Sequence, residues 1–185
     1  CKILVIDDLA NRKHVSNLIL DQNYFGSQSS ERYRNHIQPE KTELLLGPSY
    51  ALIGEEYSKL HSLLPERSKV NRILIFMGGV DKFNITGKAI EALMKNEFSS
   101  IWVDVVIGRQ TDQTEKIKSL AKERKNTTLH YQIKSLSGLI YKADLSIGGA
   151  GVTTWERCCL GLNSLVITIA NNQIPIANAL HKEGY

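Results

Sequence analysis

Short apolar runs alternate along the chain with stretches in which apolar residues recur at helical spacing. The runs are nearly continuous, as at 70–76 and 102–107, so they predict strands that are buried on both faces. The stretches between them predict helices. We expect strands at 2–6, within 14–23, and at 44–46, 70–76, 102–107, 127–131, 145–147 and 164–169, and helices at 50–64, 86–96, 112–125, 136–143, 154–160 and 174–183.

Strands that alternate with helices are typical of a parallel sheet covered on both sides. The expected fold class is therefore α/β, a Rossmann-like parallel sheet with helices on both faces. Ligands bind to such sheets outside the carboxyl ends of the strands. The loops to search for chemistry are therefore 77–81, 108–110, 131–133, 148–154 and 170–173.

One polar stretch interrupts this pattern. Residues 24–42 contain Ser29, Ser30 and Pro39 and show no clear periodicity, which predicts a linker and a nearby domain boundary. Because the chain starts at Cys1 and ends directly after a helical pattern, we expect a fragment of a longer protein.

The composition narrows the class of protein. The chain has 185 residues, 42% hydrophobic and 23% charged, which is enough for one domain or for one domain plus a fragment. No apolar run approaches the ~20 residues of a membrane span, and no signal-peptide pattern opens the chain, so we expect a cytoplasmic protein without a membrane partner. The three cysteines lack metal-like spacing, and we expect reduced thiols, with Cys158 and Cys159 packed in the interior.

The charge pattern disfavours a nucleic-acid partner. The net charge is +4, and both signs are mixed along the chain. The densest basic segment, 116–125, has no interleaved aromatic residues and is typical of a solvated helix face.

Residues 146–156 combine a strand end, a glycine turn and a helix start. Free backbone N–H groups and the helix dipole suit a phosphate there, and glycines let it approach the main chain. One hypothesis is an anion site, with Glu156 placed to reach sugar hydroxyls, formed by Gly149, Ala150, Gly151, Thr153 and Thr154. The other is a plain strand-to-helix turn with a threonine cap and an acid favoured by the dipole, in which Trp155 packs in the core.

A second glycine turn, Gly78-Gly79, follows the strand predicted at 70–76 and would meet a diphosphate from the other side. Neither turn matches Gly-x-Gly-x-x-Gly, and no Gly-x-x-x-x-Gly-Lys-Ser/Thr occurs, which disfavours NAD and P-loop chemistry. Asp81 is either a ligand contact or a helix cap, and Asn172 and Gln173 are either ligand contacts or a polar loop. No nucleophile set or metal-ligand spacing is present, so the residues themselves leave the catalytic residues unknown, and we predict no metal or cofactor.

Several segments match one family when they are taken together. They are Gly-Pro-Ser-Tyr-Ala-Leu-Ile at 47–53, Met-Gly-Gly-Val-Asp at 77–81 with Asn-Ile-Thr at 84–86, the run at 143–156 that ends in Gly-Gly-Ala-Gly-Val-Thr-Thr-Trp-Glu, Asn172-Gln173, and Asp7-Asp8-Leu9 with Arg12 and His14. With them the chain resembles the UDP-sugar hydrolases of pseudaminic acid biosynthesis. Those enzymes are related to the lipid II N-acetylglucosaminyltransferase and share its GT-B architecture, in which two Rossmann-like domains face a cleft.

The resemblance implies a domain organisation. Residues 1–24 would end an N-terminal Rossmann-like domain, 25–42 would be a linker, and 43–185 would form a C-terminal nucleotide-binding domain. The substrate would be a UDP-linked diacetamido trideoxy sugar.

The resemblance also implies the roles of individual residues. Gly78, Gly79 and residues 149–154 would hold the diphosphate, Glu156 the ribose hydroxyls, the backbone from Tyr131 to Ile133 the uracil, and Asn172 and Gln173 the sugar side. Hydrolysis would cleave the C–O bond at the anomeric carbon, with a histidine of an N-terminal glycine loop as general base. Nothing in this chain matches that loop, and His14 is not its counterpart, so we expect the chain to bind UDP weakly without turnover.

The chain departs from the family pattern at Val152, Asn171 and Lys82. Two alternatives therefore stay open. One is a GT-B glycosyltransferase that uses a UDP-sugar donor, and the other is a non-catalytic module that binds a sugar nucleotide or a partner protein.

Overall fold

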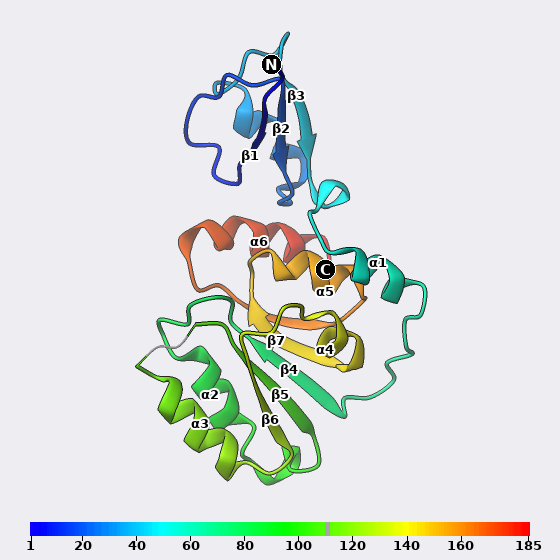
Figure 1. The fold of residues 1–185 in the computed structure, drawn as a ribbon, viewed down its shortest axis with the longest axis vertical. Coiled ribbons are helices and arrows are strands. Elements are labelled where there is room, and N and C mark those ends of the chain that lie inside the picture. The colour runs from blue at the N-terminus through cyan, green and yellow to red at the C-terminus, as the bar shows by residue number, and fades with distance from the viewer. Residues whose placement is uncertain (110–111) are drawn as a thin grey trace. The chain divides into compact units, whose positions relative to one another are not determined.

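The computed structural model describes residues 1–109 and 112–185. The chain forms two compact units, Cys1–Ile53 with Ala170–Tyr185, and Gly54–Ile169. Each unit contains its own parallel sheet, as the ribbon in Figure 1 shows. The predicted α/β class, with parallel strands flanked by helices, is confirmed.

The first unit contains a three-stranded parallel sheet of β1 (Leu4–Ile6), β2 (Leu18–Asp21) and β3 (Glu43–Leu46), in that order. Three short 3-10 helices follow the strands: η1 (Gly26–Gln28), η2 (Glu31–Tyr33) and η3 (Pro48–Tyr50). The C-terminal segment with η5 (Asn171–Gln173) and α6 (Ile174–Lys182) belongs to the same unit.

The stretch predicted as a linker, 25–42, is part of this first unit. Tyr33 is fully buried, and its hydroxyl lies 3.1 Å from Asp7 Oδ2 and 3.0 Å from Asp21 Oδ2. Arg32 Nη1 donates to Asp21 Oδ2 at 2.6 Å. The polar residues of the stretch therefore find partners at the carboxyl ends of β1 and β2, and β3 pairs with β2 instead of entering the second sheet. The change between the compact units falls after Ile53, whereas the resemblance implies a domain boundary after residue 42.

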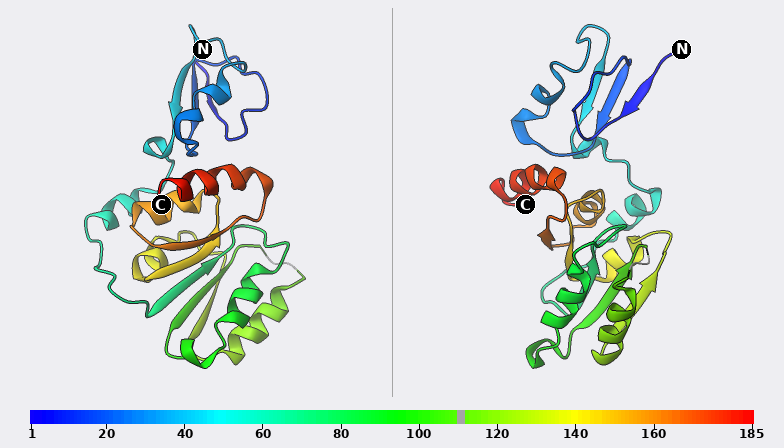
Figure 2. Two further views of the ribbon diagram at one scale, coloured as in Figure 1. Left: turned by 180° about the vertical axis from the view of Figure 1, so that it is seen from behind. Right: turned by 90° about the vertical axis from the view of Figure 1, so that its left-hand side faces the viewer.

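The second unit contains a five-stranded parallel sheet in the order β6-β5-β4-β7-β8. Its strands are β4 (Arg72–Phe76), β5 (Trp102–Ile107), β6 (Thr127–Tyr131), β7 (Leu145–Gly149) and β8 (Ser164–Ile167). Its helices are α1 (Glu55–His61), α2 (Ile85–Ala92), α3 (Thr114–Glu123), α4 (Ser137–Lys142), α5 (Thr153–Cys159) and the 3-10 helix η4 (Asn96–Phe98). Within this unit α2 and α3 lie on one side of the sheet and α4 and α5 on the other (Figures 1 and 2).

The core of this unit lies between the sheet and the pair α2 and α3. Alternate residues of the central strands, such as Ile73, Ile75 and Val105, pack against Ile90 of α2 and Ile117 of α3. Alternate positions share one face of a strand, so the second set of side chains meets the other helices. Both faces are therefore covered, which explains why the strands are almost continuously apolar.

Two local predictions are wrong. The helix predicted at 50–64 begins only at Glu55, because Pro48–Tyr50 forms a 3-10 turn and Gly54 is extended. Cys158 is exposed and Cys159 is half-buried, since the face of α5 that points inward carries Trp155.

The prediction that Trp155 packs in the core is confirmed, with 3% of its surface exposed. No helix in the described part of the chain is long and apolar enough to cross a membrane.

Candidate functional site

The candidate site lies where the strand order of the second sheet changes direction. From β4 the chain passes outward to β5 and β6, and it then returns to β7, which lies on the other side of β4. Phe76 of β4 and Gly148 of β7 are register partners, so the two carboxyl ends are level. Ligands of open α/β sheets bind at such a switch point. Both predicted glycine turns follow these two strands, and the fold brings them together.

In the first turn, Gly78 has a left-handed backbone conformation and Gly79 faces open space. Gly78 has φ +88°, a left-handed value that favours glycine. A Cβ built on Gly79 meets no atom within 4 Å, so the backbone faces open space there. On its inner side the turn rests on the loop after β5, where Arg109 N donates to Gly79 O at 3.0 Å and a Cβ on Gly108 would lie 2.7 Å from Gly78 O.

Asp81 acts as a helix cap. Its Oδ1 accepts from Ile85 N at 2.9 Å and its Oδ2 from Thr86 N at 2.7 Å. Asn84 adds a bond from Gly87 N at 3.3 Å. Both carboxylate oxygens are therefore engaged at the start of α2, and the capping alternative describes Asp81 better than the ligand alternative.

The second turn leaves backbone donors available. Ala150 is buried, whereas Gly151 is exposed and Thr153 half-buried. Among the described residues no hydrogen-bond acceptor is found for the backbone N–H groups of Gly151, Val152 and Thr153. Thr154 is different, because its Oγ1 accepts from Arg157 Nη2 at 3.2 Å and the residue is buried. The turn can thus offer main-chain donors to an anion, while the Thr154 side chain faces inward.

Glu156 stands in the first turn of α5 with an unsatisfied carboxylate. Its Oε2 is buried and has no hydrogen-bond partner among the described residues. Burial raises the pKa of Glu156, and the nearby hydroxyl of Tyr57 opposes that shift only in part. Burial also raises the pKa of Tyr57, and the charge of Glu156 adds to the effect. The Tyr57 hydroxyl does not reach hydrogen-bond geometry, so the carboxylate keeps its capacity to accept from a ligand.

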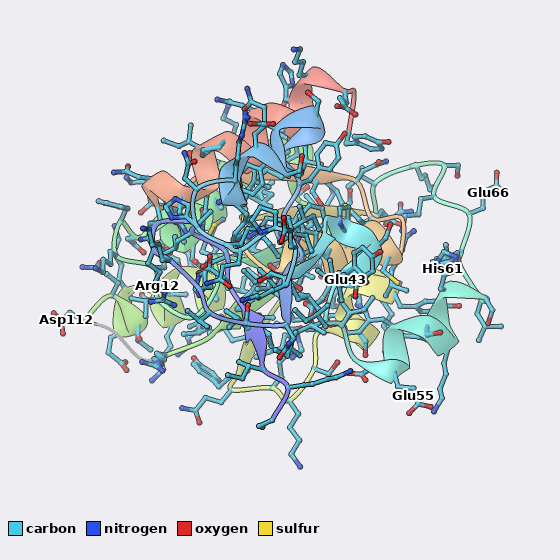
Figure 3. The ribbon with its side chains drawn as sticks, turned by 90° about the horizontal axis from the view of Figure 1, so that it is seen from above. Arg12, Glu43, Glu55, His61, Glu66 and Asp112 are labelled. Atoms are coloured by element: carbon cyan, nitrogen blue, oxygen red, sulfur yellow. The ribbon has the colours of Figure 1, made fainter. Side chains whose placement is uncertain are left out.

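Helix α1, which contacts α5, carries a second acid, Glu56, near Glu156. Glu56 Oε1 accepts from Ser135 Oγ at 2.8 Å, and the backbone and Ser135 hydrogen bonds lower the pKa of Glu56. Glu55 points outward from the start of the same helix (Figure 3) and pairs with Lys59 at 2.8 Å. Glu56 and Glu55 are therefore already partnered, in contrast to Glu156 Oε2.

Tyr131 and Ile133 flank a left-handed turn at the end of β6. Gln132 between them has φ +46°, and its N–H donates to Ile107 O at 3.3 Å. The Tyr131 ring is exposed, with Lys118 Nζ 5.9 Å from its centroid. These residues share the carboxyl edge with the glycine turns, but β5 separates β6 from β4.

Two further predicted residues follow β8 along the chain. Asn172 and Gln173 form η5, which is part of the first unit. Gln110, in the loop after β5, lies outside the described residues.

The first unit contains an open hollow. It measures about 610 Å³ and lies at the amino ends of β1, β2 and β3, next to Lys2, Asn17 and Lys41. Parallel α/β sheets bind ligands at the opposite, carboxyl edge. We therefore assign this hollow no role in the candidate site, despite its size.

Sequence reasoning missed Arg157. The residue is 3% exposed, and its guanidinium lies against the backbone of the second glycine turn. The only sequence signal is its spacing, because position 157 is one turn beyond Thr154 and shares its inward face.

No protein-family model matches the chain. An uncharacterized protein of Methanocaldococcus jannaschii is 27% identical over 136 residues, which are 70% of this chain and 28% of that protein. The spore coat polysaccharide biosynthesis protein SpsG of Bacillus subtilis is 21% identical over 154 residues, which are 83% of this chain and 45% of that protein. The crystal structure of Acinetobacter baumannii MurG matches with a TM-score of 0.58 at 20% identity, covering 90% of this chain and 51% of that one.

These comparisons place the chain coarsely. It is a distant homologue of a spore coat polysaccharide biosynthesis protein and has a GT-B-type α/β fold like that of MurG. The chain spans less than half the length of the two curated relatives and about half of the solved MurG chain.

Proposed function

We propose that the chain forms the nucleotide-binding part of a UDP-sugar hydrolase, with a UDP-linked diacetamido trideoxy sugar of the pseudaminic acid type as substrate. The observation that carries the proposal is the switch point between β4 and β7. Two glycine turns flank it, and an unpartnered buried carboxylate, Glu156, stands beside one of them. The distant homology to a polysaccharide biosynthesis protein supports a sugar-linked ligand.

Each part of the site has a distinct role in this proposal. The open backbone at Gly79 and the free N–H groups from Gly151 to Thr153 would hold the diphosphate. Glu156 would accept hydrogen bonds from the ribose hydroxyls. The turn at Gln132, between Tyr131 and Ile133, would present its backbone to the uracil.

In the reaction, water attacks the anomeric carbon, the C–O bond to UDP breaks, and the water proton passes to a general base. Backbone donors at the diphosphate stabilise the charge that develops on the leaving group. We assign the base to no residue of this chain. Asn172 and Gln173, which form η5, would contact the sugar.

A GT-B glycosyltransferase with a UDP-sugar donor is the second candidate, because the fold matches that of MurG. The two reactions share the nucleotide site and differ in the acceptor. Incubating the full-length protein with the UDP-sugar and no acceptor separates them. A hydrolase releases UDP and free sugar in equal amounts, whereas a transferase releases little UDP until an acceptor is added.

Calorimetric titration with UDP tests the site itself. We expect Glu156→Gln to weaken UDP binding by about 1–3 kcal/mol, the scale of a charge-assisted hydrogen bond. Glu55→Gln is the matched control, because Glu55 opens α1 and points outward (Figure 3). An absence of UDP binding to the unmodified chain at millimolar concentration would overturn both enzymatic hypotheses and leave the non-catalytic module.

A further inference from the structure

Arg157 is a buried cation that forms no salt bridge in the described residues, and the charge of the neighbouring Glu156 offsets its burial only in part. It is 3% exposed, and no carboxylate of the described residues lies within ion-pair distance of its guanidinium. Its Nη2 donates to Gly149 O at 2.9 Å and to Thr154 Oγ1 at 3.2 Å, while Nε is buried with no acceptor. Burial lowers the pKa of Arg157, but a guanidinium stays charged at neutral pH.

The guanidinium lies directly behind the second glycine turn. A Cβ on Gly148 would collide with Arg157 Nη1 and would lie 2.9 Å from Phe76 O. Position 148 therefore needs glycine because of the Phe76 backbone as well as the guanidinium, independently of any ligand. The side chain thus packs against the last two residues of β7, next to the switch point.

Arg157 also fixes the direction of one peptide group. The C=O and N–H of a trans peptide point in opposite directions. Because Gly149 O points to the guanidinium, the N–H of Ala150 points away from it. The hydrogen bond therefore holds the first peptide of the turn in one orientation.

An unpaired buried charge is costly unless an opposite charge comes close. In the described residues of the turn beside Arg157, the main-chain donors from Gly151 to Thr153 remain free. An anion bound there would be attracted to the guanidinium through the protein interior, where charges interact more strongly than in water. The ligand would thus add to the partial compensation that Glu156 provides.

We infer that Arg157 is a positioning residue for a bound diphosphate, acting from behind the Gly149 turn through its charge and its bond to Gly149 O. It does not touch the ligand. This inference rests on the proposed function for the identity of the ligand as UDP, but the anion site itself does not depend on the nucleoside.

Two substitutions separate the charge from the hydrogen bond. Arg157→Gln keeps a donor and removes the charge, and Arg157→Lys keeps the charge. Arg124→Gln is the matched control, because Arg124 is also buried and donates to backbone carbonyls of Leu93, Phe98 and Ile101, but it precedes the amino end of β6.

The affinities of UDP, uridine and inorganic pyrophosphate are measured by NMR titration of the unmodified chain and the variants, with circular dichroism as the test of folding. We expect Arg157→Gln to weaken UDP and pyrophosphate about tenfold and to leave uridine unchanged, and Arg157→Lys to retain most of the UDP affinity. Arg124→Gln should lower the melting temperature without changing any of the three affinities.

The other possible results either overturn or support the inference about Arg157. UDP affinity that is unchanged in Arg157→Gln, or lost equally for UDP and uridine, overturns the inference. If Arg157→Gln does not fold, a folded Arg157→Lys chain that has lost UDP binding overturns it, and one that retains binding supports it. If the unmodified chain binds pyrophosphate in an Arg157-dependent way but not UDP, the anion site stands and the proposed nucleotide fails; binding of neither sinks both.

Discussion

The carboxylate of Glu156 destabilises the unliganded chain, because its Oε2 is buried without a partner. Burial raises its pKa above the ordinary glutamate value of 4.5. Below pH 4.5 the folded and unfolded states are both protonated, so the residue costs nothing. As the pH rises through 4.5 toward the folded pKa, the unfolded state ionises first and stability falls.

We therefore predict that Glu156→Gln stabilises the free chain at neutral pH by about 1 kcal/mol, while it weakens UDP binding. The gain should vanish below pH 4. Thermal melts of both chains from pH 4 to 8 measure the difference. Melting curves that stay the same distance apart over the whole range would show that the carboxylate is not penalised by burial.

The two residues of the first glycine turn allow a sharper test of ligand approach. Gly78→Ala should destabilise the chain by about 1 kcal/mol, because alanine is unfavourable at a φ of +88°. Gly79→Ala should leave stability nearly unchanged, because its Cβ meets nothing within 4 Å. If the diphosphate lies against Gly79, the same methyl group reduces UDP affinity. Urea unfolding and UDP titration of both variants give the comparison, and normal UDP binding by Gly79→Ala would move the ligand away from this turn.

Residue types alone predicted the glycine turns and Glu156, since both have local chemical signatures. They did not decide the role of Asp81, because a turn acid can cap a helix or bind a ligand. Nor did they identify Arg157, because an arginine is usually solvated. Its burial depends on Gly148 leaving room for the guanidinium, which is a contact that only the tertiary structure shows.

At the scale of the elements, Asp81 decides how α2 begins. Its two oxygens satisfy the N–H groups of Ile85 and Thr86, which would otherwise lack acceptors. We predict that Asp81→Ala costs about 1 kcal/mol, as helix caps do, and leaves UDP affinity within twofold. Urea unfolding with a UDP titration measures both quantities. Glu66→Ala, an exposed acid of the same unit that points outward in Figure 3, should change neither, and a tenfold loss of UDP affinity in Asp81→Ala would return Asp81 to the site.

The elements with the clearest sequence pattern were predicted best. The strands expected at 102–107 and 127–131 coincide with β5 and β6, because both segments consist mostly of β-branched and aromatic residues. Prediction failed at 50–64, where apolar residues continue past a segment whose backbone is set by Pro48 and Gly54. The spacing of apolar residues does not reveal such local restrictions of the backbone.

At the scale of the whole molecule, the predicted domain boundary and the boundary between the compact units differ. Residues 25–42 lack periodicity, but Tyr33 anchors them through hydrogen bonds to Asp7 and Asp21, which are distant in sequence. The C-terminal segment belongs to the first unit for a similar reason, since Tyr24 donates to Glu183. Such contacts between distant residues leave no trace in the local pattern.

The division into two units predicts which unit UDP should protect from hydrogen exchange. A ligand that binds only the folded state stabilises it by about 2.7 kcal/mol at 100 times its Kd. Because the proposed nucleotide contacts lie within Gly54–Ile169, we expect UDP to slow hydrogen exchange in that unit, most at the N–H groups from Gly151 to Thr153. Exchange in β2, within Cys1–Ile53, should change little. Peptide-resolved mass spectrometry with and without saturating UDP measures both, and uridine is the control that lacks the diphosphate. Equal slowing in the two units would mean that they unfold as one, and slowing confined to β2 would place the nucleotide on the wrong unit.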